Sequence, residues 1–231
     1  MADALIGYTG FVGSNLARQM SFDEFYNSKN IEDIRGREFD LIVCAGMPGM
    51  KWYANAHSDE DYGAIISLLE AVRQTTSKKI VLISTVDAIR PTDVYGNHRA
   101  DAEAILRHYR DATVVRLPAL FGPGLKKNAL YDLMTGQRET EIAPNAIYQW
   151  YPLRRLGDDL RRIQEAGIRT INLVSEPIAM EEIRARFFPR YAIGLPRDDA
   201  PHYNVPCEYP EFWLSRSEIM DEMGDFLAGR D

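Results

Sequence analysis

Strand-sized runs alternate with amphipathic segments along the first half of the chain. Strands that alternate with helices are typical of βαβ units and a parallel sheet. The expected strands lie at 4–6, 24–26, 41–44, 80–83 and 113–115, and helical periodicity covers 13–20, 59–73 and 100–106. The pattern therefore predicts an α/β fold, a doubly wound Rossmann-type parallel sheet with a small C-terminal substrate lobe.

The alternation loosens after Gly124, where prolines and aromatic residues become denser. A strand at 170–174 and helices at 180–186 and 215–227 are the clear elements of this part, and the proline-rich segment 188–210 predicts an irregular loop. We expect a dinucleotide-binding Rossmann domain over residues 1–124. Residues 125–231 are expected to form the substrate lobe, interleaved with the last strands and helices of the core.

The first strand runs directly into a glycine-rich turn. Gly7, Gly10 and Gly13 stand between a strand and a helix, which is the context that makes this spacing typical of dinucleotide binding. One glycine permits the tight turn, one lets the backbone approach a pyrophosphate, and one lets helix and strand pack closely. The N-terminal N–H groups of the helix, from Phe11 and Val12 onward, would face the phosphates. The alternative is a glycine-rich turn without a ligand.

The end of the second strand bears on the choice of cofactor. It reads Asn27-Ser28-Lys29 and carries no carboxylate, whereas NAD sites usually hold the ribose 2′-hydroxyl with an acidic residue. Lys29 would face a 2′-phosphate, so the cofactor is expected to be NADP or NAD, with NADP favoured. The alternative is a solvated lysine in a turn.

A hydroxyl, a phenol and a cation form the candidate catalytic group. Thr85 follows the strand at 80–83, and Tyr95 and Arg99, four residues apart, share one face of the next helix. A cation beside a phenol favours the phenolate and lowers the pKa of the tyrosine, which suits proton transfer. Thr85 would hydrogen-bond the same substrate oxygen. Taken singly, each residue also fits a purely structural role.

Together these motifs resemble the extended short-chain dehydrogenase/reductase family of NAD(P)-dependent sugar epimerases, dehydratases and reductases. The resemblance rests on the glycine turn, the strand end Ala45-Gly46, Thr85, the Tyr95–Arg99 spacing, and the run 116–124 with its Leu117-Pro118. It implies that Tyr95 is the acid/base, that Thr85 binds the reacting oxygen, and that Arg99 stands where the family has a ribose-holding lysine. It also implies cofactor contacts at Ala45, Gly46, Leu117 and Pro118. Arginine keeps the charge but stays protonated and differs in reach.

Two departures from the pattern of the family narrow the expected class of enzyme. The short connection 27–39 resembles the dTDP-4-dehydrorhamnose reductase branch of the family. Sugar dehydratases carry an Asp-Glu pair directly after the threonine, and Val86-Asp87 here lacks one of the two carboxylates, so dehydration is not expected. Lys51, Trp52 and Asp87 are candidates for substrate contact, with solvated surface groups as the alternative.

Composition excludes several partners. A net charge of −7 argues against nucleic acid, whose binding requires a basic surface. The apolar runs are too short to span a membrane, and no secretory signal opens the chain, so a cytoplasmic location is expected. The two cysteines form no disulfide framework, and the four histidines show no metal-ligand spacing. The expected partner is a small-molecule substrate, and a homodimer is one candidate for the oligomeric state.

The function expected from these features is NAD(P)-dependent oxidoreduction or epimerisation at a carbinol or carbonyl carbon, of a sugar or nucleotide-sugar. In the reductive direction Tyr95 would supply the proton while Thr85 polarises the oxygen. The alternative is a non-catalytic dinucleotide-binding sensor or interaction protein, since fold does not fix function.

The strand end at Lys29 makes a first testable prediction. NADP should bind at least as tightly as NAD, and Lys29→Glu should shift the preference toward NAD, because a carboxylate repels the 2′-phosphate and accepts from the 2′-hydroxyl. Titration calorimetry with both nucleotides measures the shift. A wild type that binds NAD far more tightly than NADP would contradict the assignment of this strand end.

Overall fold

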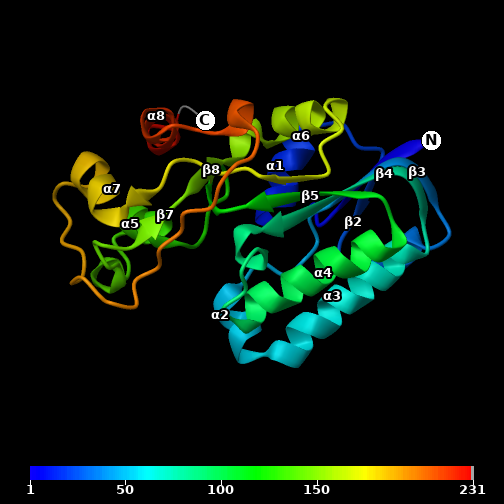
Figure 1. Cartoon of the computed structure of the whole chain (residues 1–231), viewed down its shortest axis with the longest axis horizontal. Coiled ribbons are helices and arrows are strands. Elements are labelled where there is room, and N and C mark those ends of the chain that lie inside the picture. Colours follow the sequence, from blue (N-terminus) through cyan, green and yellow to red (C-terminus); the bar gives the residue numbers. More distant parts are fainter. Residues whose placement is uncertain (230–231) are drawn as a thin grey trace. The chain divides into compact units, whose positions relative to one another are not determined.

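A computed structural model describes residues 1–229 of the chain. Its centre is a six-stranded sheet in the order β2-β1-β3-β4-β5-β9 (Figure 1). The pairings from β2 through β5 are all parallel. The strands are β1 (Ala2–Ile6), β2 (Glu24–Tyr26), β3 (Glu38–Cys44), β4 (Thr76–Thr85), β5 (Ala112–Leu117) and β9 (Thr170–Asn172). The predicted doubly wound α/β fold is confirmed.

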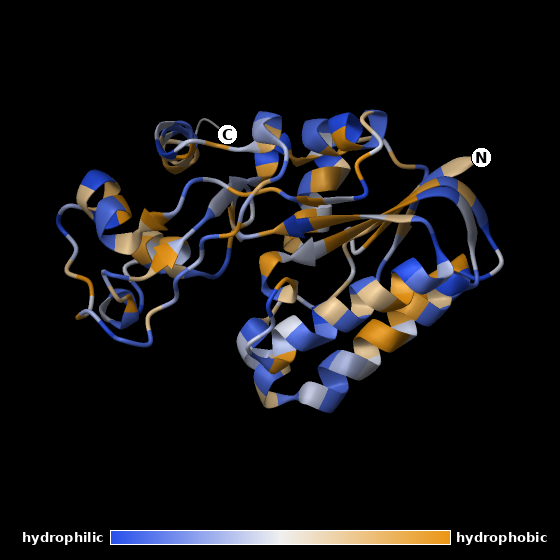
Figure 2. Ribbon diagram, viewed as in Figure 1, coloured by the Kyte–Doolittle hydropathy of each residue, from blue (hydrophilic) through white to orange (hydrophobic). Residues whose placement is uncertain are grey.

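Helices cover both faces of this sheet. In Figure 1, α3 (Ser58–Arg73) and α4 (Val94–Tyr109) lie on one face, and α1 (Phe11–Gln19) and α6 (Leu156–Glu165) on the other. Strands covered on both faces have few polar positions, and the central strands are accordingly hydrophobic along much of their length, whereas the helices are striped (Figure 2). Fully buried residues of the core include Ile42, Cys44, Leu82 and Val114 from strands and Ile65 and Ala102 from helices.

The connection between β2 and β3 is short, as the sequence predicted. It contains only a single 3-10 turn, η1 (Ile31–Ile34), whose Ile34 is buried in the core. β3 pairs with β1 on the side away from β2. The carboxyl ends of β1 and β3 thus flank the point where the strand order reverses, which is where open α/β sheets bind their ligands.

The chain divides into two compact units. The first contains residues up to Leu117 together with Leu156–Ile171, and the second contains Pro118–Arg155 and the residues from Asn172 onward. The chain thus leaves the first unit before Gly124 and returns to it for α6, a helix that we did not expect. Leu156, Leu160 and Ile163 are its fully buried apolar residues, and they are widely spaced among arginines and aspartates.

The second unit has its own core. Its helices are α5 (Ala129–Thr135), α7 (Met180–Phe187) and α8 (Arg216–Leu227), and two strand pairs join β6 (Ala119–Phe121) to β8 (Trp150–Pro152) and β7 (Ile147–Tyr148) to β10 (Ile178–Ala179). Its core is built from Phe121, Leu130, Leu133, Trp150, Ile178, Ile183, Ile219 and Met223. The segment 188–209 contains no regular helix or strand, as expected.

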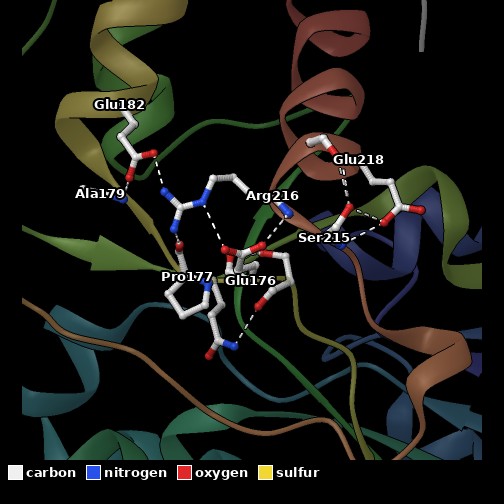
Figure 3. A network of polar contacts seen from close by, with 10 residues as sticks. Glu176, Pro177, Ala179, Glu182, Ser215, Arg216 and Glu218 are labelled. Atoms are coloured by element: carbon white, nitrogen blue, oxygen red, sulfur yellow. Dashed lines mark hydrogen bonds and ion pairs between the residues drawn. The ribbon is translucent and has the colours of Figure 1, made fainter.

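A polar network fixes the start of α8 in this unit (Figure 3). Arg216 donates to Glu182 at 2.5 Å, to Glu176 at 3.2 Å and to the Pro177 carbonyl at 2.9 Å. Ser215 caps α8, and the Glu218 carboxylate accepts a hydrogen bond from the Ser215 backbone in return. Exposed ion pairs stabilise little, so the network chiefly sets where the helix begins.

Candidate functional site

Backbone atoms pack unusually closely around two glycines of the first turn. Gly7 has a φ of +86°, and a Cβ added to it would lie 2.3 Å from the Ala45 carbonyl oxygen at the end of β3. A Cβ on Gly13 would lie 2.1 Å from the Gly7 carbonyl oxygen. No side chain fits at either position, so these two glycines are required by the fold itself.

Gly10 differs from both neighbours. The only atom that an added Cβ would meet within 4 Å is the Gly7 carbonyl oxygen, at 3.3 Å, so the space in front of Gly10 is open. Gly10 is the N-cap of α1 and no side chain caps the helix. The N–H groups of Phe11, Val12 and Gly13 are therefore the unsatisfied donors of the first turn. Open space, free donors and the positive end of a helix dipole together fit a pyrophosphate.

The end of β2 lies next to this turn, because the Gly7 N–H donates to the Tyr26 carbonyl at 2.7 Å. The residues that follow form an ordered turn in which the Asn27 side chain accepts from the Lys29 N–H at 2.9 Å. Ser28 and Lys29 are exposed, as a contact to a ribose would require. Residues 27–30 contain no carboxylate.

The other expected cofactor residues follow β3 or lie at the end of β5. The Ala45 N–H donates to the Ile6 carbonyl at 2.9 Å, which brings Ala45-Gly46 to the carboxyl end of β1. Leu117 is the buried last residue of β5. Pro118 follows it as the first residue of the second unit.

Thr85 and Tyr95 stand at the end of β4 and the start of α4. The Thr85 hydroxyl donates to Asp87 Oδ2 at 3.2 Å and accepts from the Asp87 N–H at 3.2 Å. Asp93 caps α4 through the Gly96 N–H at 2.8 Å. The Tyr95 N–H donates to the side chain of Asn55 at 2.9 Å, which ties the start of α4 to α2 (Lys51–Ala56).

Lys51, the first residue of α2, joins the same cluster. Its Nζ lies 2.8 Å from Asp87 Oδ1, 3.1 Å from Asp93 Oδ2 and 5.8 Å from the centroid of the Tyr95 ring. The structure thus brings Lys51, Thr85, Asp87 and Tyr95 together, although the sequence had suggested Lys51 and Asp87 only as substrate contacts. The neighbouring Trp52 is 67% exposed, and its ring contacts Tyr53.

Arg99 packs on Tyr95 as its helical spacing predicted. The guanidinium carbon lies 3.8 Å from the ring centroid. The side chain is nevertheless sealed, with 1% of its surface exposed, because it forms a bidentate pair with Asp61 of α3 at 2.5 and 2.9 Å and also donates to the Pro48 carbonyl. Both terminal nitrogens of the guanidinium are therefore committed to protein groups, and Nε, which has no hydrogen-bond partner, is buried, so the expectation that Arg99 holds a ribose is not supported by this geometry.

Asp61, like Asn55 and Asp93, is a site residue that sequence reasoning missed. It is buried on the same face of α3 as Ile65 and Leu68. Its oxygen Oδ2 also accepts from His98, whose Nδ1 lies 2.8 Å away. A carboxylate at helical spacing from buried apolar residues was the available signal, because such a group needs a buried partner.

The expected lowering of the Tyr95 pKa does not occur. Burial raises the pKa of Tyr95, and the nearby Asp87 raises it further, while the Arg99 guanidinium and, more weakly, Lys51 lower it. Burial outweighs the cations, so the pKa is raised overall and the prediction based on Arg99 alone was wrong in sign.

Within residues 1–229 no group of three or more histidine, cysteine, aspartate or glutamate side chains is arranged to hold a metal ion. No helix in that range is both long and apolar enough to cross a membrane. Neither a protein-family model nor a curated protein sequence matches the chain.

Solved structures do match it. A UDP-glucose 4-epimerase from Thermotoga maritima, solved with UDP-glucose, is 12% identical with a TM-score of 0.74 over 99% of this chain and 98% of the epimerase. A dTDP-4-dehydrorhamnose reductase from Bacillus anthracis, in complex with NADP, is 14% identical with a TM-score of 0.75 over 98% and 97%. The Bordetella bronchiseptica enzyme WbmG, in complex with NAD, is 14% identical with a TM-score of 0.74 over 98% and 93%.

The chain has the fold of these epimerases and reductases. The likeness extends over nearly the whole of each chain, including the segment after Gly124. At such low identity it concerns the arrangement of the elements.

The buried pair of Asp61 and Arg99 makes a prediction about stability. Asp61→Asn leaves the Arg99 guanidinium buried without its counter-charge, which should lower the free energy of unfolding by about 3–5 kcal/mol. Urea denaturation measures the loss. Asp59→Asn, an exposed carboxylate in the same helical turn, is the matched control and should change little. If both variants lowered the free energy of unfolding equally, the buried pair would contribute no more to stability than an exposed carboxylate does.

Proposed function

We propose that this chain is an NAD(P)-dependent oxidoreductase or epimerase of the extended short-chain dehydrogenase/reductase family, acting on a carbinol or carbonyl carbon of a sugar or nucleotide-sugar. The observation that carries the proposal is the placement of two groups at the carboxyl edge of one sheet. An open glycine cradle follows β1, and the Thr85 and Tyr95 hydroxyl groups belong to the end of β4 and the helix after it. β1 and β4 are separated only by β3.

A nicotinamide dinucleotide is the cofactor that this edge would hold. The pyrophosphate would lie on the N–H groups of Phe11, Val12 and Gly13, in front of Gly10, with Ala45-Gly46 beside it. The adenosine ribose would face the turn 27–30, where Lys29 favours NADP over NAD. Similar structures contain either cofactor, NADP in the reductase and NAD in WbmG. When bound, the nicotinamide supplies the hydride chemistry.

Tyr95 is proposed as the proton donor. Because burial raises its pKa, the side chain is a protonated phenol near neutral pH, which suits transfer of a proton to a substrate oxygen in the reductive direction. Thr85 would donate its hydroxyl hydrogen to the same oxygen, turning away from Asp87 to do so. Asp87 is the only carboxylate among residues 86–89, which directly follow Thr85, and this fits reduction or epimerisation better than elimination.

A second candidate function has one observation in its favour. Arg99 is buried against Asp61, so the position at which the family has its lysine carries a guanidinium that stays protonated near neutral pH. A dinucleotide-binding sensor or interaction protein would keep the glycine cradle without needing that lysine.

Cofactor binding is tested at Gly10. Gly10→Val should abolish binding of NADP and NAD, because a side chain would occupy the open space where the backbone meets the pyrophosphate. Calorimetry measures the affinity. Gly63→Ala, at a helical glycine of α3 with no atom within 4 Å of an added Cβ, is the control and should bind normally. Unchanged affinity of the Gly10 variant would remove the proposal's central claim.

Catalysis is tested at Tyr95. Tyr95→Phe should lower turnover by about 10²–10⁴-fold, the usual contribution of a general acid, and should leave cofactor affinity nearly intact. NADPH absorbance with a panel of nucleotide-keto-sugars measures turnover. Tyr109→Phe, at the other end of α4 and likewise beside an arginine, is the matched control. Full activity in Tyr95→Phe on an identified substrate would leave only a dinucleotide-binding protein.

A further inference from the structure

Two cations lie against the Tyr95 ring, and their surroundings differ. Arg99 is buried, both of its terminal nitrogens donate to Asp61, and Nη2 also donates to the Pro48 carbonyl. Its Nε has no hydrogen-bond partner but is buried as well, so a hydrogen bond to a ligand would require the packing around Arg99 to open. Arg99 is therefore a constant charge that ties α4 to α3, two helices that pack along each other.

Lys51 is the accessible cation of the two. Its side chain is 40% exposed, and its Nζ contacts two carboxylates from different segments. Asp87 belongs to η2 (Val86–Ala88), directly after Thr85, and Asp93 caps the helix that begins with Val94 and Tyr95. Lys51 thus joins the segment that carries Thr85 to the segment that carries Tyr95.

The hydrogen bond of the Thr85 hydroxyl is the reason to expect that Lys51 affects the reacting groups. A hydroxyl has a single hydrogen to donate, and in this structure it is directed to Asp87 Oδ2. Donation to a substrate oxygen requires that bond to be released, so Asp87 Oδ2 would lose this hydrogen bond. Lys51, on the other oxygen of the same carboxylate, holds Asp87 in place when Thr85 turns away.

On the basis of the proposed function, we infer that Lys51 is the cation that acts on the reacting pair Thr85 and Tyr95, whereas Arg99 has a structural role. Lys51 acts through Asp87 on Thr85 and directly, as a nearby charge, on Tyr95. It is a positioning residue, supplied by α2 rather than by the helix that carries the tyrosine.

The sign of its effect on Tyr95 follows from the charges that face the ring. They are Arg99 on α4, Asp61 on α3, Asp87 on η2 and Lys51 on α2, and a further carboxylate, the N-cap Asp93 of α4, contacts Lys51 at 3.1 Å. Arg99 and Asp61 form the sealed pair and stay constant. Removing the charge of Lys51 leaves Asp87 and Asp93 uncompensated and disfavours the phenolate, so the pKa at position 95 rises. Removing the charge of Asp87 has the opposite effect.

A reporter at position 95 tests this without cofactor or substrate. Tyr95 is replaced by 3-nitrotyrosine, whose phenol ionises nearer neutrality and changes its visible absorbance when it does. Lys51→Met should raise the pKa of the reporter by about one unit, a Coulomb effect reduced by the exposure of the lysine. Lys51→Arg should restore the wild-type titration, and Asp87→Asn should lower the pKa.

The control is Lys78→Met. Lys78 lies near the other end of β4 and also pairs with a carboxylate, Asp40, at 2.7 Å, so its removal should leave the titration unchanged. Urea denaturation of each variant separates positioning from folding: Lys51→Met should keep the wild-type midpoint, whereas Arg99→Lys should lower it. A reporter that does not respond to Lys51→Met, or a midpoint lowered as much as in Arg99→Lys, overturns the inference. Full activity in Tyr95→Phe would instead overturn the proposed function, while the titration of the reporter would still test the effect of Lys51 on position 95.

Discussion

The backbone of Gly7 touches the backbone at the end of β3 on one side and that of Gly13 on the other, and the site depends on this contact. Added Cβ atoms would lie 2.3 and 2.1 Å from carbonyl oxygens, which is well inside any van der Waals distance. The contact sets how closely α1 approaches the sheet and brings its first N–H groups to the carboxyl ends of β1 and β3. Gly10 lies between them in the sequence, and a Cβ added to it would come no closer than 3.3 Å to the Gly7 carbonyl oxygen. The same turn therefore combines two glycines required by packing with one that leaves room for a ligand.

Charge around the candidate tyrosine is arranged in two pairs with different properties. The pair of Arg99 and Asp61 is buried between two helices. Losing either partner would lower the free energy of unfolding, and the pair is not accessible to a ligand. The pair of Lys51 and Asp87 is partly exposed and connects to Thr85 and to the cap of α4. An arginine at position 99 is thus not equivalent to a lysine in this context, because the planar guanidinium favours a bidentate pair with the Asp61 carboxylate.

Burial and charge act against each other at Tyr95. A cation 3.8 Å from the ring centroid would by itself favour the phenolate, but enclosing the phenol penalises that charged form more strongly. The sign of the pKa shift is therefore a property of the packed environment and not of the Tyr95–Arg99 spacing. A protonated phenol is the form needed to donate a proton.

Local patterns in the sequence determined the α/β class, most of the sheet strands, the glycine turn and the candidate pair of Thr85 and Tyr95, because period and turn chemistry act over a few residues. Only the tertiary structure decided the partners of Arg99 and Lys51, which lie 38 and 36 residues away at Asp61 and Asp87. It also decided that the chain returns to the first unit for α6, and that burial outweighs charge at Tyr95. These outcomes depend on side chains from distant segments that meet in the folded core, where desolvation sets the strength of every charge, and no local pattern carries that information.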